Sequence, residues 1–232
     1  MKSNGKEQAN RYFRTTVNGK FSKRTKQVIA IEKDERLAEI AKELTKKFSN
    51  TEIVANDILQ WQLPKPLHST PYKLVGNLPY YAATPIIKKF LEEVPRQPKI
   101  LVAMMQKEVA QRICANPPDM TLLSVSVQFY GTPSITEIVK KESFWPKPAV
   151  DSAILKIVPH QTHAKENREL FVRVVTAGFR HPRRQLFNNL VIGLHLPRET
   201  VESALSRCGI DAARRAETLS VQDWVALAKF LS

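Results

Sequence analysis

Glycine is scarce in this chain of 232 residues. The sequence has only seven glycines, and the two that are closest to each other, Gly5 and Gly19, lie 14 positions apart. A Gly-x-Gly-x-Gly turn therefore cannot occur anywhere in the chain. This excludes a nucleotide-binding loop of the kind that depends on closely spaced glycines.

Cysteine and long apolar runs are also in short supply. The two cysteines, Cys114 and Cys208, are far apart and lack the spacing of metal ligands. We therefore expect reduced thiols in a cytoplasmic protein, and no bound metal. No apolar run approaches the ~20 residues that cross a membrane, and the N-terminus lacks a hydrophobic signal core. The sequence thus predicts a soluble protein with no membrane partner.

Acidic residues are outnumbered by basic ones. The 22 Asp and Glu stand against 36 Lys and Arg, which gives a formal net charge of +14. Residues 1–30 carry half of this excess, since they contain eight Lys or Arg and only one acid, Glu7. Such a balance favours a polyanionic partner. A solvated basic surface without a partner is the alternative.

Compact apolar runs alternate with amphipathic segments along the first two thirds of the chain. The run at residues 28–31 is typical of a parallel strand buried on both faces, and Asp34 is suited to cap the helix that follows. Further strands are expected at 52–55, 72–75 and 99–105, with helices at 84–93 and 106–115. This alternation predicts an open, mainly parallel α/β sheet.

The remainder of the chain changes character. Residues 122–130 fit either an alternating strand or a helix buried on several sides, whereas 135–140 and 151–158 predict paired strands. From residue 167 onward the pattern is entirely helical, with helices at about 167–179, 183–194, 198–208 and 220–231. Gly178, Gly193 and Gly209 fall near the expected helix ends, as C-capping glycines do.

The most informative segment is Asn77-Leu78-Pro79, followed by Tyr80 and Tyr81, at the end of a short apolar run. The Asn77 side-chain carbonyl and the Leu78 backbone carbonyl can both accept hydrogen bonds from the exocyclic amine of a nucleobase. Pro79 restricts the backbone and offers no competing N–H, and Tyr80 offers a face for stacking. The alternative is a plain turn built around asparagine.

Six motifs together are similar to one known family. They are residues 28–37 (VIAIEKDERL), 56–57, 76–85 (GNLPYYAATP), 105–112 (MQKEVAQR), 144–152 (FWPKPAVDS), and 177–190 with 214–219 in the tail. On these, the chain resembles the small-subunit ribosomal RNA adenine N6,N6-dimethyltransferases, the KsgA group, over residues 24–232. The tail favours this group over the related antibiotic-resistance methyltransferases.

The resemblance implies both a fold and an activity. It implies a Rossmann-like methyltransferase domain with a small all-α C-terminal domain. It also implies methyl transfer from S-adenosylmethionine, without a metal, to N6 of two adjacent adenines near the 3′ end of small-subunit ribosomal RNA. The implied partner is that RNA within the pre-30S particle, and the implied state is a monomer.

The resemblance further implies which residues hold the methyl donor. Glu32 would accept from the ribose hydroxyls, Asp57 from the donor adenine beside the Ile58 backbone, and Asn77 would line the same site. Each has a plainer alternative. An acid after a strand is often solvated or caps a helix, and Asp57 fits an Asx turn.

The resemblance also implies which residues bind the target base. Asn77, Leu78, Pro79 and Tyr80 would bind the flipped adenine, and Phe144 would form the second aromatic face. Ordinary packing is the alternative for the proline-rich loop around Phe144, and packing is the role we expect for Trp145. The transfer would proceed directly, without a covalent enzyme intermediate.

A basic segment in the tail is a candidate RNA contact. Arg180, Arg183 and Arg184 flank a histidine and a proline ahead of an expected helix. We expect these arginines to contact phosphates, and a solvated helix end is the alternative.

One part of the family pattern is missing. The first strand and the glycine-rich loop that holds the methionine part of the donor are absent, and residues 11–17 with the Asn18-Gly19 turn are a candidate substitute strand. We therefore divide the chain into an atypical basic segment 1–22, a methyltransferase domain 23–160 and a helical RNA-contacting domain 161–232. A catalytically impaired or truncated member that acts only in RNA binding or ribosome assembly is the competing hypothesis, and a nonfunctional fragment is a third.

Overall fold

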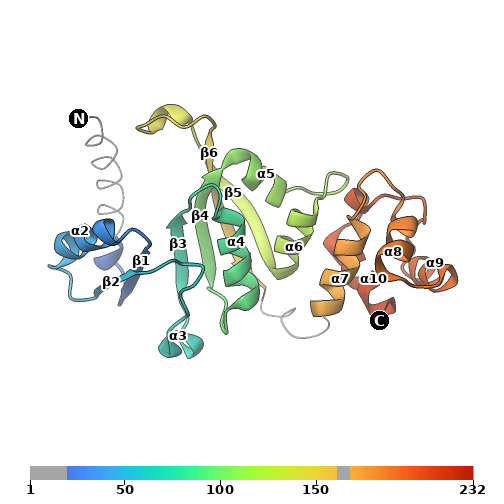
Figure 1. The fold of residues 1–232 in the computed structure, drawn as a ribbon, viewed down its shortest axis with the longest axis horizontal. Coiled ribbons are helices and arrows are strands. Elements are labelled where there is room, and N and C mark those ends of the chain that lie inside the picture. The colour runs from blue at the N-terminus through green and yellow to red at the C-terminus, as the bar shows by residue number, and fades with distance from the viewer. Residues whose placement is uncertain (1–19, 161–167, 232) are drawn as a thin grey trace. The chain divides into compact units, whose positions relative to one another are not determined.

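The computed structural model describes residues 20–160 and 168–231. Contacts divide the chain into two compact units, one made of Met1–His68 with Lys140–Ala149 and the other of Ser69–Val139 with Val150–Ser232. Each unit has its own sheet (Figure 1). The candidate strand at 11–17 and nearly all of the segment 1–22 lie outside the described residues. The three domain limits expected from the sequence therefore stay predictions.

The first unit contains two parallel strands joined by a helix. Strand β1 (Val28–Glu32) pairs along its length with β2 (Thr51–Ala55), and α2 (Glu35–Thr45) connects them. Helix α2 begins where expected, because the Asp34 side chain accepts a hydrogen bond from Leu37 N at 3.1 Å. A short helix, α3 (Lys65–Ser69), follows β2 and has no counterpart in the sequence-based prediction.

Strand β1 differs from its expected environment in one respect. Every one of its residues is only partly buried, although the run at 28–31 is typical of burial on both faces. Within the described part of the chain, β1 pairs with β2 alone and is therefore an edge strand. An edge strand lacks a neighbour on one side, and its apolar side chains accordingly stay half-exposed.

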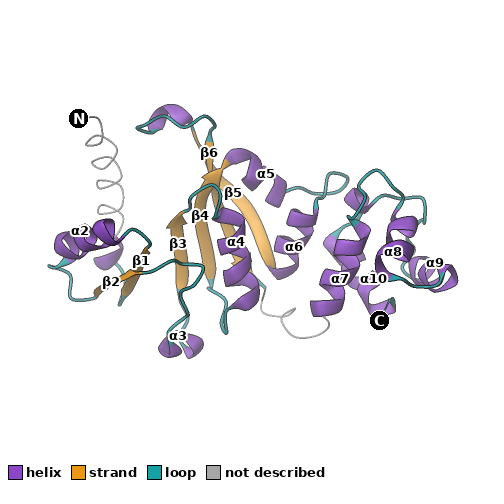
Figure 2. Ribbon diagram, viewed as in Figure 1, coloured by secondary structure: helices purple, strands orange, loops and turns teal. Residues whose placement is uncertain are grey.

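The second unit contains a mixed four-stranded sheet (Figure 2). Its strands are β3 (Lys73–Asn77), β4 (Ile100–Gln106), β6 (Ser152–Pro159) and β5 (Gly131–Val139), in that spatial order. The pair β3–β4 is parallel, whereas β4–β6 and β6–β5 are antiparallel. The expectation of a mainly parallel sheet thus holds only as far as β4. Strands β5 and β6 form the predicted pair, and the structure shows that this pair is antiparallel.

One face of this sheet forms the core. Leu101, Ala103 and Met105 of β4 lie opposite Ile157, Leu155 and Ala153 of β6, and all six are at most 1% exposed. Helices α5 (Lys107–Ile113) and α6 (Leu122–Tyr130) pack against the sheet. Helix α4 (Ala83–Lys88) continues into a π-helical turn, Lys89–Glu93, where the sequence predicts a single helix.

The structure resolves the ambiguity at residues 122–130 in favour of the buried helix α6. Thr121 and Ser124 form a capping box, in which Ser124 N donates to Thr121 Oγ1 and Thr121 N donates to Ser124 Oγ. The capping box supplies acceptors for backbone N–H groups that have no partner within the first turn of the helix. Val125, Val127, Phe129 and other members of this helix are buried, which explains why its apolar pattern lacks a clear period.

The C-terminal part is helical, as predicted. It contains α7 (Arg168–Gly178), α8 (Leu186–Leu194), α9 (Arg198–Arg207) and α10 (Val221–Phe230). Helix α7 packs against α8 and α10, α9 packs against the same two helices, and Trp224 of α10 is fully buried. None of the helices that the structure describes has the length and apolar character needed to cross a membrane.

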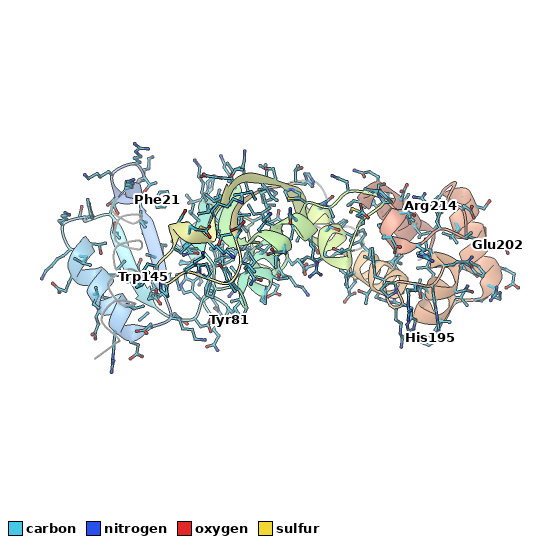
Figure 3. The ribbon with its side chains drawn as sticks, turned by 90° about the horizontal axis from the view of Figure 1, so that it is seen from above. Phe21, Tyr81, Trp145, His195, Glu202 and Arg214 are labelled. Atoms are coloured by element: carbon cyan, nitrogen blue, oxygen red, sulfur yellow. The ribbon has the colours of Figure 1, made fainter. Side chains whose placement is uncertain are left out.

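Only one of the three glycines near helix ends acts as the expected C-cap. Gly209, after α9, has φ +66°, which favours glycine. A side chain on Gly178 would overlap Trp224, and one on Gly193 would overlap Ala177. Close helix packing therefore explains those two glycines, and His195, in the left-handed conformation, ends α8 (Figure 3).

Candidate functional site

The Asn77-Leu78-Pro79 box lies where the sequence places it, at the carboxyl end of β3. Asn77 is the last residue of the strand and pairs with Met104 of β4. Leu78 N donates to the Met104 carbonyl at 3.0 Å, and Ala82 N donates to the Pro79 carbonyl at 2.9 Å. The box is therefore held at both ends, by a strand on one side and by a turn into α4 on the other.

Two acceptor oxygens of the box have no partner among the residues that the structure describes. The Asn77 side chain is exposed and makes no hydrogen bond to them, and the Leu78 carbonyl accepts none from them. An amide oxygen and a backbone carbonyl at adjacent positions can accept both N–H bonds of a primary amine. This arrangement suits recognition of an exocyclic amino group.

Tyr80 stands next to these acceptors. It is 40% exposed, so part of its ring is open to solvent. Its hydroxyl lies 3.2 Å from Ser152 Oγ, at the start of β6. The adjacent Tyr81 is 81% exposed and is labelled in Figure 3. The contact with Ser152 was not predictable from the chain, because the two residues are 72 positions apart.

Glu32 and Asp57 lie close together within the first unit. Each stands at or just after the carboxyl end of its strand, and Asn56 N donates to the Glu32 carbonyl at 2.9 Å. Asp34 N donates to Glu32 Oε1 at 3.0 Å. Parallel strands bring such residues to one edge of a sheet, where ligands of α/β proteins bind.

The carboxylate of Asp57 contacts both a backbone amide and a lysine. Leu59 N donates to Asp57 Oδ1 at 2.9 Å, so the Asx turn that the sequence offers as an alternative is present. The Lys33 ammonium lies 2.8 Å from Asp57 Oδ2. These contacts fix the orientation of the carboxylate, and Ile58 follows it in the same turn.

Phe144 and Trp145 lie in the loop after the 3-10 turn at Lys141–Ser143. Phe144 is half-buried, whereas Trp145 is 76% exposed (Figure 3). The prediction that Trp145 packs is therefore wrong. A 2.7 Å ion pair between Glu142 and Lys147 spans the loop, and the hydrogen bond from Lys147 lowers the pKa of Glu142.

The predicted site residues divide between the two units. Glu32, Asp57, Ile58 and Phe144 belong to the first, and the residues of the box, 77–80, belong to the second. The structure brings Glu32 and Asp57 together, and it keeps the box intact. The union of both groups in one site stays a prediction.

The three tail arginines, Arg180, Arg183 and Arg184, lie exposed in the loop between α7 and α8. None of them forms an ion pair with the residues described. The buried Asn189 of α8 shapes this loop, because its side-chain amide donates to the Gly178 carbonyl at 2.7 Å and to the His181 carbonyl at 3.0 Å. This role depends on the packing of α8 against the end of α7 and was not predictable from the residue type alone.

The described part of the chain contains no candidate metal centre. Over residues 20–160 and 168–231, no group of three or more His, Cys, Asp or Glu side chains is placed to hold an ion. Cys114 and Cys208 are both free thiols, and burial raises the pKa of each. A raised pKa disfavours the reactive thiolate.

Comparison with known proteins points to one family. A family described as ribosomal RNA adenine dimethylase matches residues 15–232. The ribosomal RNA small subunit methyltransferase A of Dehalococcoides mccartyi (strain ATCC BAA-2100) is 43% identical over 87% of this chain and 70% of that protein. The protein of the same name from Clostridioides difficile is 35% identical over 94% of this chain and 78% of that protein.

Two solved structures share the fold. The 23S rRNA methyltransferase ErmE aligns with a TM-score of 0.72 at 24% identity, over 90% of this chain and 84% of that one. A dimethyladenosine transferase from Plasmodium falciparum aligns with a TM-score of 0.76 at 23% identity, over 87% of this chain and 80% of that one. The predicted fold, a Rossmann-like domain followed by a helical part, is confirmed.

Proposed function

Because the chain belongs to the ribosomal RNA adenine dimethylase family, we propose that it dimethylates adenine at N6 in small-subunit ribosomal RNA, with S-adenosylmethionine as the methyl donor. The targets are two adjacent adenines near the 3′ end of that RNA. One observation carries the proposal: the exposed Asn77 side chain and the Leu78 carbonyl stand side by side at the end of β3, next to a half-exposed tyrosine.

The chemical problem is the weak nucleophilicity of an adenine amine, whose lone pair is delocalised into the ring. Acceptance of both N–H bonds by Asn77 and Leu78 holds the amine in one orientation and favours localisation of its lone pair. Pro79 fixes the turn that carries these acceptors. Preorganised acceptors of this kind act without reorganisation during the reaction.

The target base must leave the RNA stack to reach the box, at a cost of roughly a few kcal/mol. Stacking on an aromatic side chain contributes ~1–3 kcal/mol per base. Tyr80 supplies one such face, and we assign the second to Phe144. Two faces of this strength offset the cost of flipping.

The residues of the first unit fit the nucleoside half of S-adenosylmethionine. Glu32 would bind the ribose hydroxyls, and Asp57, with the Ile58 backbone, would bind the adenine; Asn77 would line the site near the reacting carbon. A carboxylate accepts up to about four hydrogen bonds, so the observed bonds to Glu32 and Asp57 are compatible with these roles. When bound, the donor supplies an electrophilic methyl group on a sulfonium.

The methionine half of the donor lacks its usual glycine-rich support, because no two glycines of this chain are closer than 14 positions. Methyl transfer requires no side chain with a shifted pKa to act as general base, since an alkylated amine loses its proton readily. Direct transfer to N6 follows, without a covalent enzyme intermediate. Residues that bind the amine therefore dominate the activity.

A second candidate function is RNA binding without catalysis, and the same scarcity of glycine favours it. The exposed loop of Arg180, Arg183 and Arg184 would then contact phosphates of the pre-30S particle while no methyl group is transferred. In either case we propose that the protein acts as a cytoplasmic monomer on the small-subunit RNA.

Calorimetric titration with S-adenosylmethionine, followed by a transfer assay, distinguishes the two. The assay uses a small-subunit RNA fragment with two adjacent adenines and identifies N6,N6-dimethyladenosine by mass spectrometry. Micromolar donor binding with formation of that nucleoside is the expected result. Retained RNA binding with neither donor binding nor transfer would support the second function instead.

A further inference from the structure

A buried serine contacts the tyrosine of the box. The Tyr80 hydroxyl and Ser152 Oγ are 3.2 Å apart, and either oxygen can donate the hydrogen bond. Both residues belong to the second unit, so their relation does not depend on how the two units are placed. Ser152 is only 2% exposed, whereas Tyr80 is 40% exposed. A polar side chain buried to this extent needs a partner, and Tyr80 provides it.

Ser152 is held rigidly by the sheet. It is the first residue of β6, an interior strand that pairs with β4 on one side and with β5 on the other. In this register Ser152 lies opposite both Gln106 and Val139. A residue with a strand on each side has little freedom to move. Its hydroxyl is therefore a fixed point near the box.

Tyr80, in contrast, lies in the turn between β3 and α4. A half-exposed tyrosine in a turn samples several χ1 rotamers when nothing holds it. A hydrogen bond at the far end of the ring fixes the line from Cβ to Oη, and with it the position of the stacking face. Rotation about that line leaves the bond intact, so the bond controls χ1 rather than the flipping of the ring.

We propose that Ser152 is a positioning residue for methyl transfer, which acts by anchoring the Tyr80 hydroxyl so that the ring is held at one position beside the flipped adenine. This role rests on the proposed function. Ordering the ring in advance removes an entropic cost from the step in which the base stacks. The anchor thus contributes to turnover more than to RNA affinity, which resides mainly in phosphate contacts.

The first test measures the anchor itself, without any substrate. Three-bond couplings from the backbone nitrogen and carbonyl carbon to Cγ report χ1 of Tyr80 in the isotopically labelled full chain. A single rotamer is expected in the unaltered protein, and averaged couplings are expected in Ser152→Ala. Tyr81→Phe is the matched control, because it removes a hydroxyl from the neighbouring exposed ring and should leave the Tyr80 couplings unchanged.

The second test measures the consequence for the reaction. Tyr80→Phe keeps the stacking face and removes the anchor, and Ser152→Ala removes the anchor from the other side. Each should lower kcat about fivefold, the size of effect expected from one hydrogen bond, while KM for RNA stays within about twofold. Because both changes remove the same bond, the double variant should be no slower than either single variant.

The outcomes separate the anchor from the proposed function. Rates of Tyr80→Phe equal to those of the unaltered chain, or losses that multiply in the double variant, would overturn the positioning role while leaving the activity established. Loss confined to Ser152→Ala would indicate a packing defect and would also overturn it, since Tyr80→Phe changes only a half-exposed ring. Absence of transfer by the unaltered chain would contradict the proposed function itself, whatever the couplings show.

Discussion

Arg168, the first residue of α7, donates from its guanidinium to the carboxylate of Glu92 at 3.2 Å and also to the Glu92 backbone carbonyl. Glu92 belongs to the π-helical turn after α4, and its side chain is 9% exposed. The same guanidinium lies 5.5 Å from the centre of the Tyr130 ring, at the end of α6. One side chain thus ties the helical tail to two elements that flank the sheet.

Replacement of Arg168 by methionine should destabilise the protein by about 1–3 kcal/mol, because it leaves a mostly buried carboxylate that, among the described residues, pairs with Lys88 alone. Partial exposure of Arg168 keeps the cost below that of a fully buried pair. Urea denaturation gives the free energy of unfolding. Arg173→Met, an exposed position on the same helix, is the matched control and should change little.

The effect of Arg168→Met should depend on pH in a definite direction. Burial raises the pKa of Glu92, and the charges of Lys88 and Arg168 act against that rise. A pKa raised in the folded state means that stability is lost as the pH increases through it. Loss of Arg168 raises the pKa further, so the destabilisation should be larger at pH 7 than near pH 4. A destabilisation independent of pH would contradict this account.

Asn77→Ala should abolish most of the methyl transfer, by about a hundredfold or more in kcat, because it removes an acceptor for the target amine. The side chain is exposed and forms no hydrogen bond with the described residues, so the melting temperature should stay within a degree or two. Transfer to the RNA fragment and thermal unfolding are measured on the same preparation. If Asn77→Ala transferred methyl groups as fast as the unaltered chain, the box would not bind the target amine as proposed.

The sequence was sufficient to predict most elements of the fold, for reasons that particular residues make clear. Asp34 caps α2, and the apolar run at 28–31 forms β1, because local chemistry determines both. The segment 122–130 stayed ambiguous since its apolar pattern fits two structures, although the capping box of Thr121 and Ser124 does specify a helix start. The half-exposed state of β1 depends on which strands pair, and this is not a local property.

The site was predictable in part. The box at 77–80 and the acids after two strands follow from residue type and position. The exposure of Trp145 and the contact between Tyr80 and Ser152 do not, because both depend on packing and register between segments distant in the chain. The sequence pattern thus predicts which functional residues lie at the end of each strand. The tertiary structure determines which other residues contact them.

Asn189→Asp tests whether the buried amide shapes the basic loop. The Asn189 amide donates to two carbonyls, and a carboxylate in its place would turn an oxygen toward them. We expect destabilisation of about 1–3 kcal/mol and weaker RNA binding. Asn188→Asp is the control, because it introduces the same charge at the preceding, more exposed position. Equal losses of RNA affinity in both variants would show that charge alone, and not loop geometry, is responsible.

The basic loop itself should determine part of the salt dependence of RNA binding. Arg183 and Arg184 are exposed and form no ion pair with described residues, so both are available to phosphates. Each phosphate contact contributes roughly 0.7–0.9 to the slope of log K against log salt. Arg183→Ala/Arg184→Ala should therefore weaken binding and flatten that slope by up to about two, as measured by filter binding over a salt series.

A control with the same change in net charge distinguishes a local contact from general attraction. Lys42 and Lys46 lie exposed in and just after α2, in the other unit. Lys42→Ala/Lys46→Ala removes two positive charges but should leave the slope nearly unchanged if those lysines do not touch RNA. If both double variants flatten the slope equally, the RNA is attracted by the overall excess of positive charge, and the loop between α7 and α8 has no special role.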